Sequence, residues 1–318
     1  MTKIDLITGF LGAGKTEFIK KYAHFLMEQG EHICILENDF GAVNVDMVLL
    51  HDLLGKKCDL EMIIGGDGAQ AHKRRFRTKL IAMGMKGYDR VLMEPSGIFD
   101  MDEFFDALYE EPLDQWYQAE NIITIIDAGL ADHISEASEY LLASETACAG
   151  KVVFSKCQNV TPDKAAGTLA QVNSALEKYH CQRKFELEDI LTRDWNDLTT
   201  EDFMKLKSCG YMHADIGRIP VDFEKAYGTQ FFFGLSLSEE ELMAGCAGIF
   251  NDQACGNVIR IKGFVQEGDA YREINATREG TETKSISVGQ EVLIVIGENL
   301  NKDRIAGYLT NERNGSAK

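Results

Sequence analysis

The 318-residue sequence predicts an α/β protein, with a mostly parallel sheet covered by helices on both faces, followed by a smaller α+β domain. Through the first two thirds of the chain, short and continuously apolar runs alternate with longer amphipathic stretches. This pattern is typical of strands buried on both faces and of helices that cover them. Beyond residue 228, neighbouring strand-like runs are joined by short polar turns, which indicates antiparallel pairing. We therefore expect two domains, residues 1–225 and residues 226–318.

Each expected strand of the larger domain is an apolar run, and a loop and a helix-like segment follow most of them. The expected strands are residues 4–8, 32–36, 60–64, 90–93, 122–126 and 151–154. The expected helices are residues 15–28, 73–83, 101–109 and 163–178. A parallel sheet built in this way binds ligands beyond the carboxyl ends of its strands, so we expect the functional site there.

The smaller domain has the predicted order strand, helix, four strands and helix. These elements are residues 230–234, 238–249, 257–266, 270–276, 285–288, 291–296 and 302–309. The domain carries no recognisable chemistry of its own. We expect it to act as a lid that responds to a client protein or to a metal.

The composition narrows the range of partners. A formal net charge of −18 argues against nucleic acid and anionic membrane as main partners, because both would repel the chain. The N-terminus shows no signal-peptide pattern, and no apolar run approaches the ~18 residues that a membrane span needs. The eight cysteines form no CxxC pair, which favours buried and reduced thiols. We therefore expect a cytoplasmic protein.

Residues 9–16, GFLGAGKT, match the pattern GxxxxGK[ST] between the first expected strand and a helix. Glycines let successive backbone N–H groups turn inward around phosphate oxygens, and the helix N-terminus adds its positive dipole. The Lys15 ammonium would reach the β- and γ-phosphates, and the Thr16 hydroxyl would ligate Mg²⁺. The expected phosphate-binding residues are Gly9, Gly12, Ala13, Gly14, Lys15 and Thr16. This phosphate loop (residues 9–16) predicts the binding of a nucleoside triphosphate.

Acidic residues end two of the expected strands. Glu94 closes the apolar run RVLME, where an acid holds Mg²⁺ through water or orients the attacking water. Glu37 and Asp39 in LENDFG would lie near the metal and the phosphates, although Asn and Asp are also ordinary turn residues. We expect Lys15, Thr16 and Glu94 to be catalytic, and Thr16, Glu94 and Glu37 to hold Mg²⁺ directly or through water.

With these motifs the chain resembles the CobW-type P-loop GTPases, a family of metal chaperones and cobalamin-related proteins. The hydrogenase and urease maturation GTPases are the wider kin of that family. The resemblance is carried by GFLGAGKT at 9–16, LENDFGAVNVD at 36–46, LMEPSG at 92–97, IITIIDA at 122–128 and VIRIKGFV at 258–265. It implies a GTPase that is slow without a partner and binds guanine nucleotide. It also implies delivery of a transition metal, commonly zinc or cobalt, or maturation of a metalloprotein client.

The expected base-binding segment is SKCQ at residues 155–158, where the family typically has NKxD. Ser155, Lys156 and Gln158 are the candidate residues, with the Lys156 stem along the purine face. An aspartate would accept two hydrogen bonds from guanine, whereas the Gln158 amide has one carbonyl oxygen and a repelling NH₂ donor. Losing that pair of bonds removes about 1–3 kcal/mol of base discrimination. GTP is the first expectation, and relaxed specificity or ATP is the alternative.

The family normally carries a CxCC metal motif after the third strand, but this chain has GGDGAQAH at 65–72. Without thiolates, zinc or cobalt would rely on Asp67 and His72, with Glu37 or Cys58 as additions. Such ligands make a weaker and less selective site than thiolates do. The alternatives are a nucleotide-gated binding or scaffold protein that handles no transition metal, and an ATP-driven maturation factor for a corrinoid or other cofactor protein. The sequence names neither the client nor the oligomeric state.

The basic run HKRRFRTK at 72–79 directly follows that turn. On a helix, Arg74, Arg75 and Lys79 fall near one side, while Phe76 and Leu80 can face the core. The run is either a solvated helix face or a contact for nucleotide phosphate or for an acidic partner, including an arginine finger. Trp195 and His213 are interpreted as packing or hinge residues.

Overall fold

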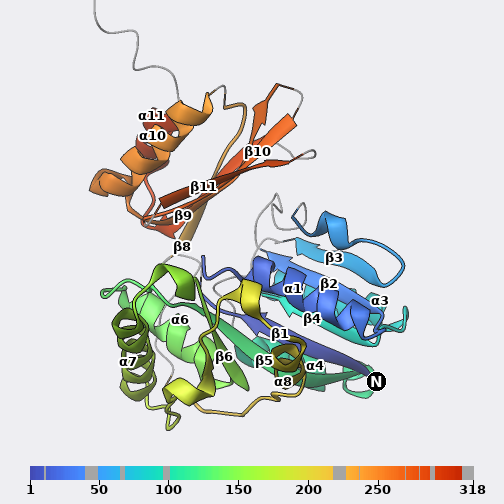
Figure 1. The fold of residues 1–318 in the computed structure, drawn as a ribbon. Helices are drawn as coiled ribbons and strands as arrows, with labels where there is room; N and C mark the ends of the chain where they lie inside the picture. The colour runs from blue at the N-terminus through green and yellow to red at the C-terminus, as the bar shows by residue number, and fades with distance from the viewer. Residues whose placement is uncertain are drawn as a thin grey trace, which may run out of the picture. The chain divides into compact units, whose positions relative to one another are not determined.

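The computed structural model of the chain is divided into two compact units, Met1–Pro220 and Val221–Lys318 (Figure 1). It describes residues 1–10, 12–39, 49–64, 69–95, 101–217, 227–235, 237–268, 270–278, 280–286 and 291–309. The boundary predicted between residues 225 and 226 lies within 218–226, a stretch that is outside the described residues.

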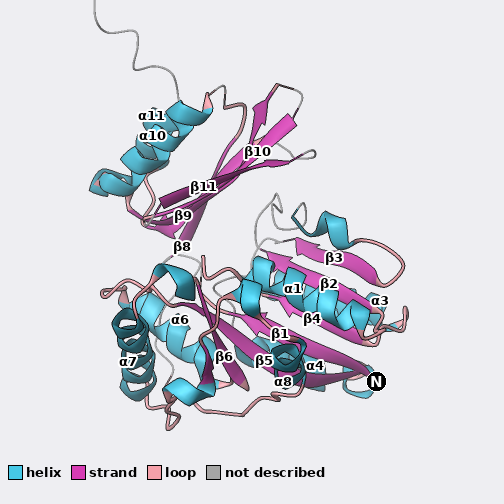
Figure 2. Cartoon of the chain, in the orientation of Figure 1, coloured by secondary structure: helices cyan, strands magenta, loops and turns pink. Residues whose placement is uncertain are grey.

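The larger unit is built on a seven-stranded sheet with the order β3-β2-β4-β1-β5-β6-β7, in which every pair of neighbours is parallel (Figure 2). The strands are β1 (Thr2–Thr8), β2 (Ile33–Asp39), β3 (Cys58–Ile64), β4 (Arg90–Glu94), β5 (Tyr117–Asp127), β6 (Lys151–Ser155) and β7 (Ile190–Leu191). The predicted parallel sheet is confirmed. The apolar pattern does not predict β7, because two residues are too few to form an apolar run.

Helices cover both faces of this sheet. They are α1 (Lys15–Glu28), α3 (Ala69–Gly84), α4 (Met101–Tyr109), α5 (Leu113–Trp116), α6 (Glu136–Ala147), α7 (Pro162–Lys178) and α8 (Thr200–Lys207). The alternation along β5 shows how the faces are shared: Ile123 and Ile125 pack with α1 and α8, whereas Ile122 and Ile126 face α3 to α7. Among the helices of the described residues, none has both the length and the hydropathy of a membrane span.

Short 3₁₀ turns complete the connections of the larger unit. They are η1 (His51–Leu53), η2 (Cys157–Asn159), η3 (Leu187–Asp189) and η4 (Trp195–Asp197). Two of them, η2 and η4, follow β6 and β7, and they therefore lie at the carboxyl edge of the sheet, where the phosphate loop also begins.

A buried polar network joins β1, β4, β5 and α1. Arg90 Nη1 donates to both carboxylate oxygens of Asp5 at 2.6 and 2.7 Å, and both side chains are buried. The Tyr22 hydroxyl and the Asn121 amide also donate to Asp5, at 2.8 and 2.7 Å. Arg90 Nε donates to Glu31 at 2.9 Å. Burial raises the pKa of Asp5, while the Arg90 charge and the three hydrogen-bond donors oppose that rise.

The smaller unit is a five-stranded antiparallel sheet with the order β11-β10-β9-β12-β8, and two helices pack on one of its faces. Its elements are β8 (Tyr227–Phe232), α10 (Glu239–Asn251), η5 (Gln253–Cys255), β9 (Asn257–Glu267), β10 (Ala270–Thr277), β11 (Gly280–Ile286), β12 (Val292–Glu298) and α11 (Lys302–Leu309). The predicted antiparallel domain is confirmed. The strand expected at 285–288 corresponds to β11, which begins earlier, at Gly280. Its start was not predicted because β11 alternates exposed and half-buried polar residues and has no apolar run.

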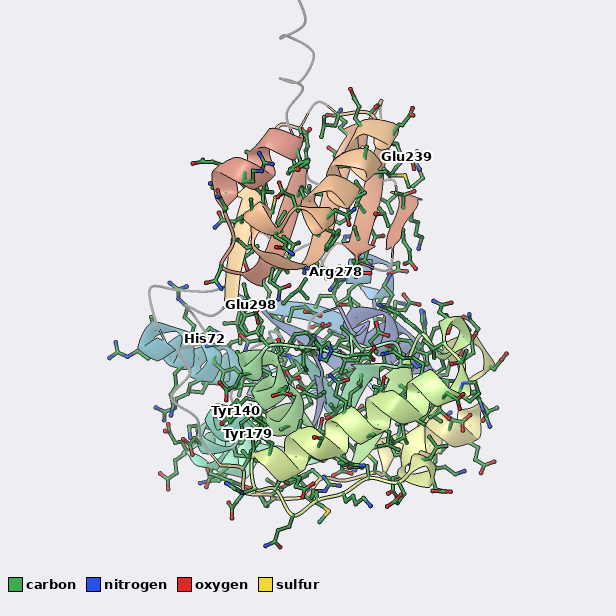
Figure 3. The ribbon with its side chains drawn as sticks, turned by 90° about the vertical axis from the view of Figure 1, so that its left-hand side faces the viewer. His72, Tyr140, Tyr179, Glu239, Arg278 and Glu298 are labelled. Carbon is green, nitrogen blue, oxygen red and sulfur yellow. The ribbon has the colours of Figure 1, made fainter. Side chains whose placement is uncertain are left out.

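Side-chain contacts tie the helices to their neighbours within each unit (Figure 3). Tyr140 of α6 and Tyr179 after α7 meet edge to face, with ring centroids 5.2 Å apart. In the smaller unit, Glu239 at the start of α10 accepts hydrogen bonds from Arg272 at 3.1 Å and from Thr283 at 2.8 Å. The second pair of contacts holds the start of α10 to β10 and to the edge strand β11.

Candidate nucleotide-binding site

The phosphate loop connects β1 to α1, and its backbone requires glycine. Gly9, Gly12 and Gly14 have φ values of 140°, 81° and 93°, a region that side chains rarely adopt. A Cβ on Gly9 would lie 2.1 Å from the Ile125 carbonyl oxygen of β5. The first residue of the phosphate loop therefore lies tightly against the neighbouring strand β5, and no residue larger than glycine fits at position 9.

Lys15 is the first residue of α1 and is 8% exposed. Its Nζ donates to the Gly9 carbonyl oxygen at 2.8 Å, so the side chain curls back over the loop. The residue before the helix, Gly14, supplies no capping side chain. A helix start without such a cap presents its amide groups and its dipole to an anion. The loop thus combines a fixed ammonium with a helix N-terminus, which suits phosphate.

Oxygen atoms gather beside Lys15 at the ends of two strands. The Thr16 hydroxyl donates to Glu94 Oε1 at 3.3 Å, and Glu37 is the register partner of Glu94 on the neighbouring strand β2. All three side chains are buried. Hydroxyl and carboxylate oxygens are the ligands that Mg²⁺ prefers, so these residues fit that ion. The side chain of Asp39, the other acid expected here, lies outside the described residues.

The expected base-binding segment follows β6. Lys156 has a φ of 55° and its Nζ lies 2.6 Å from Asp127 Oδ2, while Gln158 is exposed. Asp127 ends β5 opposite Ser155, and its other oxygen accepts the Gly129 N–H at 2.8 Å. Asp127 therefore fixes the direction of the Lys156 stem. In the sequence, Asp127 stands out only as part of the segment IITIIDA at 122–128, although adjacent parallel strands that end together would have suggested the contact.

Trp195 of η4 packs directly against the phosphate loop. Its indole Nε1 donates to the Phe154 carbonyl oxygen at 3.0 Å, and its ring centroid lies 5.6 Å from that of Phe18. A Cβ on Gly14 would lie 3.4 Å from the indole ring. The packing interpretation of Trp195 agrees with these contacts, but its place at the loop was missed. No motif marks it, because it lies 41 residues along the chain from its hydrogen-bond partner.

The turn expected to hold a transition metal falls only partly within the described residues. Asp67 lies in 65–68, outside the described residues, whereas His72 is on α3 and is buried (Figure 3). The Nε2 atom of His72 forms a 2.7 Å hydrogen bond with Asn38 Oδ1 at the end of β2. In the described ranges, no group of three or more His, Cys, Asp or Glu residues is arranged to hold a metal ion.

The suggestion that Cys58 joins this site is wrong. Cys58 begins β3 and pairs with Ile33 at the start of β2, whereas the turn follows the other end of β3. A seven-residue strand spans about 20 Å, which separates the thiol from His72 by the height of the sheet. Burial raises the pKa of the Cys58 thiol to about 12, so it also lacks the thiolate character of a metal ligand.

The basic run forms part of α3. Phe76 and Leu80 are fully buried, as expected, and Lys79 makes a 2.8 Å ion pair with Glu61 of β3. Other basic residues of the run line a hollow of about 310 Å³ against α4: Lys73, Arg74 and Arg77. The ion pairs of Lys73, Arg77 and Lys79 are therefore with neighbouring segments of the same unit, which supports the solvated-face interpretation for these three residues.

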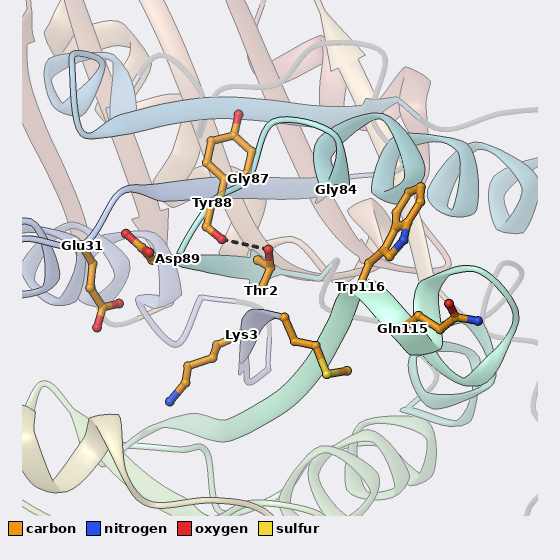
Figure 4. Close-up of a pocket in the computed structure, with 10 residues that line it drawn as sticks. Thr2, Lys3, Glu31, Gly84, Gly87, Tyr88, Asp89, Gln115 and Trp116 are labelled. Atoms are coloured by element: carbon orange, nitrogen blue, oxygen red, sulfur yellow. Dashed lines mark hydrogen bonds between the residues drawn. The ribbon is translucent and has the colours of Figure 1, made fainter.

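A larger hollow of about 630 Å³ lies at the opposite edge of the sheet (Figure 4). It is lined by the start of β1 and by the residues before β4, where the Thr2 hydroxyl donates to the Tyr88 carbonyl oxygen at 2.8 Å. The phosphate loop follows the other end of β1, at Thr8. This hollow is therefore separate from the nucleotide site.

Two curated proteins are similar to the chain in sequence. The chain is 27% identical to the zinc chaperone YjiA of Escherichia coli (strain K12) over 186 residues, which cover 55% of this chain and 56% of that protein. It is 31% identical to the zinc chaperone YeiR of the same organism over 166 residues, which cover 51% of this chain and 49% of that protein. The chain thus spans about half the length of the curated relatives it matches.

Solved structures resemble the chain at low similarity. The crystal structure of Zn(II)-bound YjiA GTPase from E. coli has a TM-score of 0.37 and 16% identity, with 98% of this chain and 99% of that chain covered. The structure of HypB from Helicobacter pylori in complex with nickel has a TM-score of 0.38 and 17% identity, with 65% and 84% covered.

The family assignment comes from the sequence. Residues 3–185 match the profile described as the CobW/HypB/UreG nucleotide-binding domain. That match includes the phosphate loop, the Thr16–Glu94 pair and the segment around Lys156. The chain therefore belongs to the CobW/HypB/UreG family of nucleotide-binding domains.

Proposed function

We propose that the protein is a Mg²⁺-dependent GTPase that couples nucleotide binding and hydrolysis to metal delivery or to the maturation of a metalloprotein client. The observation that carries this proposal is the phosphate loop, in which Lys15 curls over Gly9 beside the buried Thr16–Glu94 pair. The names of the relatives YjiA and YeiR, both zinc chaperones, support the metal half of the proposal.

The residues of the loop supply positioning and charge. The backbone amides of residues 12–16 and the Lys15 ammonium bind the phosphates and neutralise the charge that develops during transfer to water. Glu94 lies at the strand end, where its carboxylate orients the attacking water. Thr16, Glu94 and Glu37 would hold Mg²⁺, which neutralises phosphate oxygens when bound. Such a site is slow by itself, because no partner residue yet stabilises the transition state.

Phosphate release from GTP tests this assignment. Thr16→Ala removes the hydroxyl beside Glu94, so we expect Mg²⁺-dependent hydrolysis to fall by at least about tenfold. Thr78→Ala is the matched control, because that exposed hydroxyl only bonds the Arg74 carbonyl oxygen within α3. Equal rates in wild type and Thr16→Ala would refute the role of this pair.

The base preference is part of the proposal. GTP is favoured by the family, whereas Gln158 in place of an aspartate weakens guanine recognition. Lys156 pairs with Asp127, and we propose that its aliphatic stem lies along the face of either purine. Competition between GTP and ATP at equal concentration for the same protein decides between a GTPase and an ATP-driven maturation factor. A preference for ATP would favour the ATP-driven maturation factor.

A second candidate is a nucleotide-gated binding or scaffold protein that handles no transition metal. It is favoured by His72, whose Nε2 bonds Asn38, and by the absence of cysteine from residues 65–72. Titration with zinc or cobalt, with and without nucleotide, separates the two. Tight binding that is lost in the Asp67→Ala/His72→Ala variant would support metal delivery, and no binding in the wild type would support the scaffold.

A further inference from the structure

Glu145, near the end of α6, is a buried carboxyl that the proposed chemistry does not use. The residue is 1% exposed. Both of its carboxyl oxygens are shielded from solvent, and neither makes a hydrogen bond of ordinary geometry with the residues that the structure describes. Its backbone carbonyl accepts the Thr124 hydroxyl of β5 at 2.7 Å, which fixes the end of α6 to the sheet. Burying an ionisable group without hydrogen-bond partners lowers the stability of the fold, so its presence here needs an explanation.

The surroundings of Glu145 place it against the phosphate loop. Thr8, which ends β1 just before the loop, lies beside the carboxyl, and the Lys15 ammonium interacts with it electrostatically. Thr8 and Thr124 are register partners on adjacent strands, so Glu145 of α6 covers the carboxyl end of that pair. Burial raises the pKa of Glu145 to about 8, and the Lys15 charge and the Thr8 hydroxyl act against that rise.

The Lys15 ammonium can therefore interact with two anions, the Glu145 carboxylate and the phosphates of a bound nucleotide. Without nucleotide, its positive charge favours the ionised form of Glu145. When nucleotide is bound, its phosphates neutralise the Lys15 charge and place negative charge close to the Glu145 carboxyl. Because like charges repel, the neutral form of Glu145 is then favoured. Among the described residues, the charge that acts on the pKa of Glu145 is that of Lys15 of α1, and the Thr8 hydroxyl of β1 is the polar group that acts on it.

We propose that Glu145 is a proton-linked positioning partner of Lys15, and that nucleotide phosphates bind to the loop together with the uptake of a proton at Glu145. This inference rests on the proposed nucleotide function. The carboxylate takes its proton from solvent, and no covalent bond to the nucleotide changes. The loop then binds phosphate most tightly when Glu145 is neutral, and the affinity falls as the pH rises through the pKa of this group.

Calorimetry of GDP binding to the full chain tests the proposal directly. The titration is run at pH 8 in two buffers with different heats of ionisation, because their difference gives the number of protons taken up. We expect an uptake of about half a proton at pH 8, since Glu145 is then half ionised before GDP binds. Phosphate groups lose their last proton near pH 6, so the nucleotide itself contributes little at this pH.

The pH profile of affinity gives the second readout. Between pH 7 and pH 9 we expect the affinity of the wild type for GDP to fall by about tenfold. Glu145→Gln keeps the shape of the side chain but cannot ionise, so its profile is flat and its proton uptake is lost. Glu136→Gln is the matched control on the same helix, where the side chain is 71% exposed, and it should behave as the wild type.

The outcomes separate this inference from the function it rests on. GDP binding without proton uptake in the wild type, or with the same uptake in Glu145→Gln, would overturn the role of Glu145 and leave the nucleotide site intact. Absence of GDP binding at every pH would overturn the nucleotide function as well. If Glu145→Gln does not fold, the two-buffer measurement on the wild type still decides the question.

Discussion

Replacing Glu145 by glutamine should change how the stability of the larger unit depends on pH. The pKa of Glu145 in the folded protein is about 8, against an ordinary value of 4.5. Above pH 4.5 the unfolded chain loses this proton while the folded chain keeps it, so the unfolded state binds fewer protons. Stability therefore falls as the pH rises from 4.5 to 8, and it becomes level above the folded pKa.

The size of the effect follows from the same two values. Between pH 5 and pH 8, the free energy of unfolding of the wild type should fall by about 3–4 kcal/mol through this group alone. Glu145→Gln lacks the titration and should not show that fall. The comparison uses the change between the two pH values, which removes any constant difference between a buried acid and a buried amide.

Urea unfolding followed by tryptophan fluorescence is the assay. The chain has two tryptophans, Trp116 of α5 and Trp195 of η4, and both lie in the larger unit, so the signal reports that unit. The exposed Glu136→Gln variant is the control and should follow the wild type. A wild type and a Glu145→Gln variant that lose the same stability between pH 5 and pH 8 would refute the assignment of a raised pKa to this carboxyl.

Three further predictions concern the core and the site. Arg90→Met leaves the buried Asp5 carboxylate without its counter-charge and should cost about 3–5 kcal/mol in urea unfolding; an unchanged midpoint would show that Tyr22 and Asn121 suffice. Gly9→Ala forces a Cβ against a strand carbonyl oxygen 2.1 Å away, so nucleotide affinity should be lost in calorimetry, and retained affinity would contradict the loop geometry. Gln158→Asp restores a two-acceptor carboxylate and should raise the preference for GTP over ATP by about ten- to a hundredfold in competition binding. An unchanged ratio of GTP affinity to ATP affinity in Gln158→Asp would contradict the proposed role of Gln158 in base recognition.

Local patterns predicted most of the fold because the strands of a parallel sheet are buried on both faces. Runs such as 122–126 are apolar throughout, and the glycines of residues 9–16 are dictated by backbone angles that other residues rarely adopt. The same reasoning fails for β7 and for the start of β11. The first is too short for a pattern, and the second exposes its side chains, so neither leaves an apolar signal.

The site was predicted where a motif is continuous and missed where it is assembled by folding. The Thr16–Glu94 pair follows from two motifs at strand ends. Trp195 and Glu145 reach the phosphate loop from distant segments; the sequence marks Trp195 only as a packing or hinge residue and gives Glu145 no motif at all. The suggestion about Cys58 failed for the opposite reason. Cys58 is close to the turn in sequence but is separated from it in space by the full length of β3.

The central claim is that residues 9–16 bind the phosphates of a nucleotide through Lys15. Isothermal calorimetry with GTP and Mg²⁺ tests it most directly, comparing wild type, Lys15→Ala and Lys20→Ala, the last being a control on the same helix whose charge pairs with Asp52. We predict binding in the wild type and in Lys20→Ala, and an affinity lower by about ten- to a hundredfold or more in Lys15→Ala, since a charge-assisted hydrogen bond is lost. Equal affinity in Lys15→Ala, or no heat from the wild type, would contradict the claim.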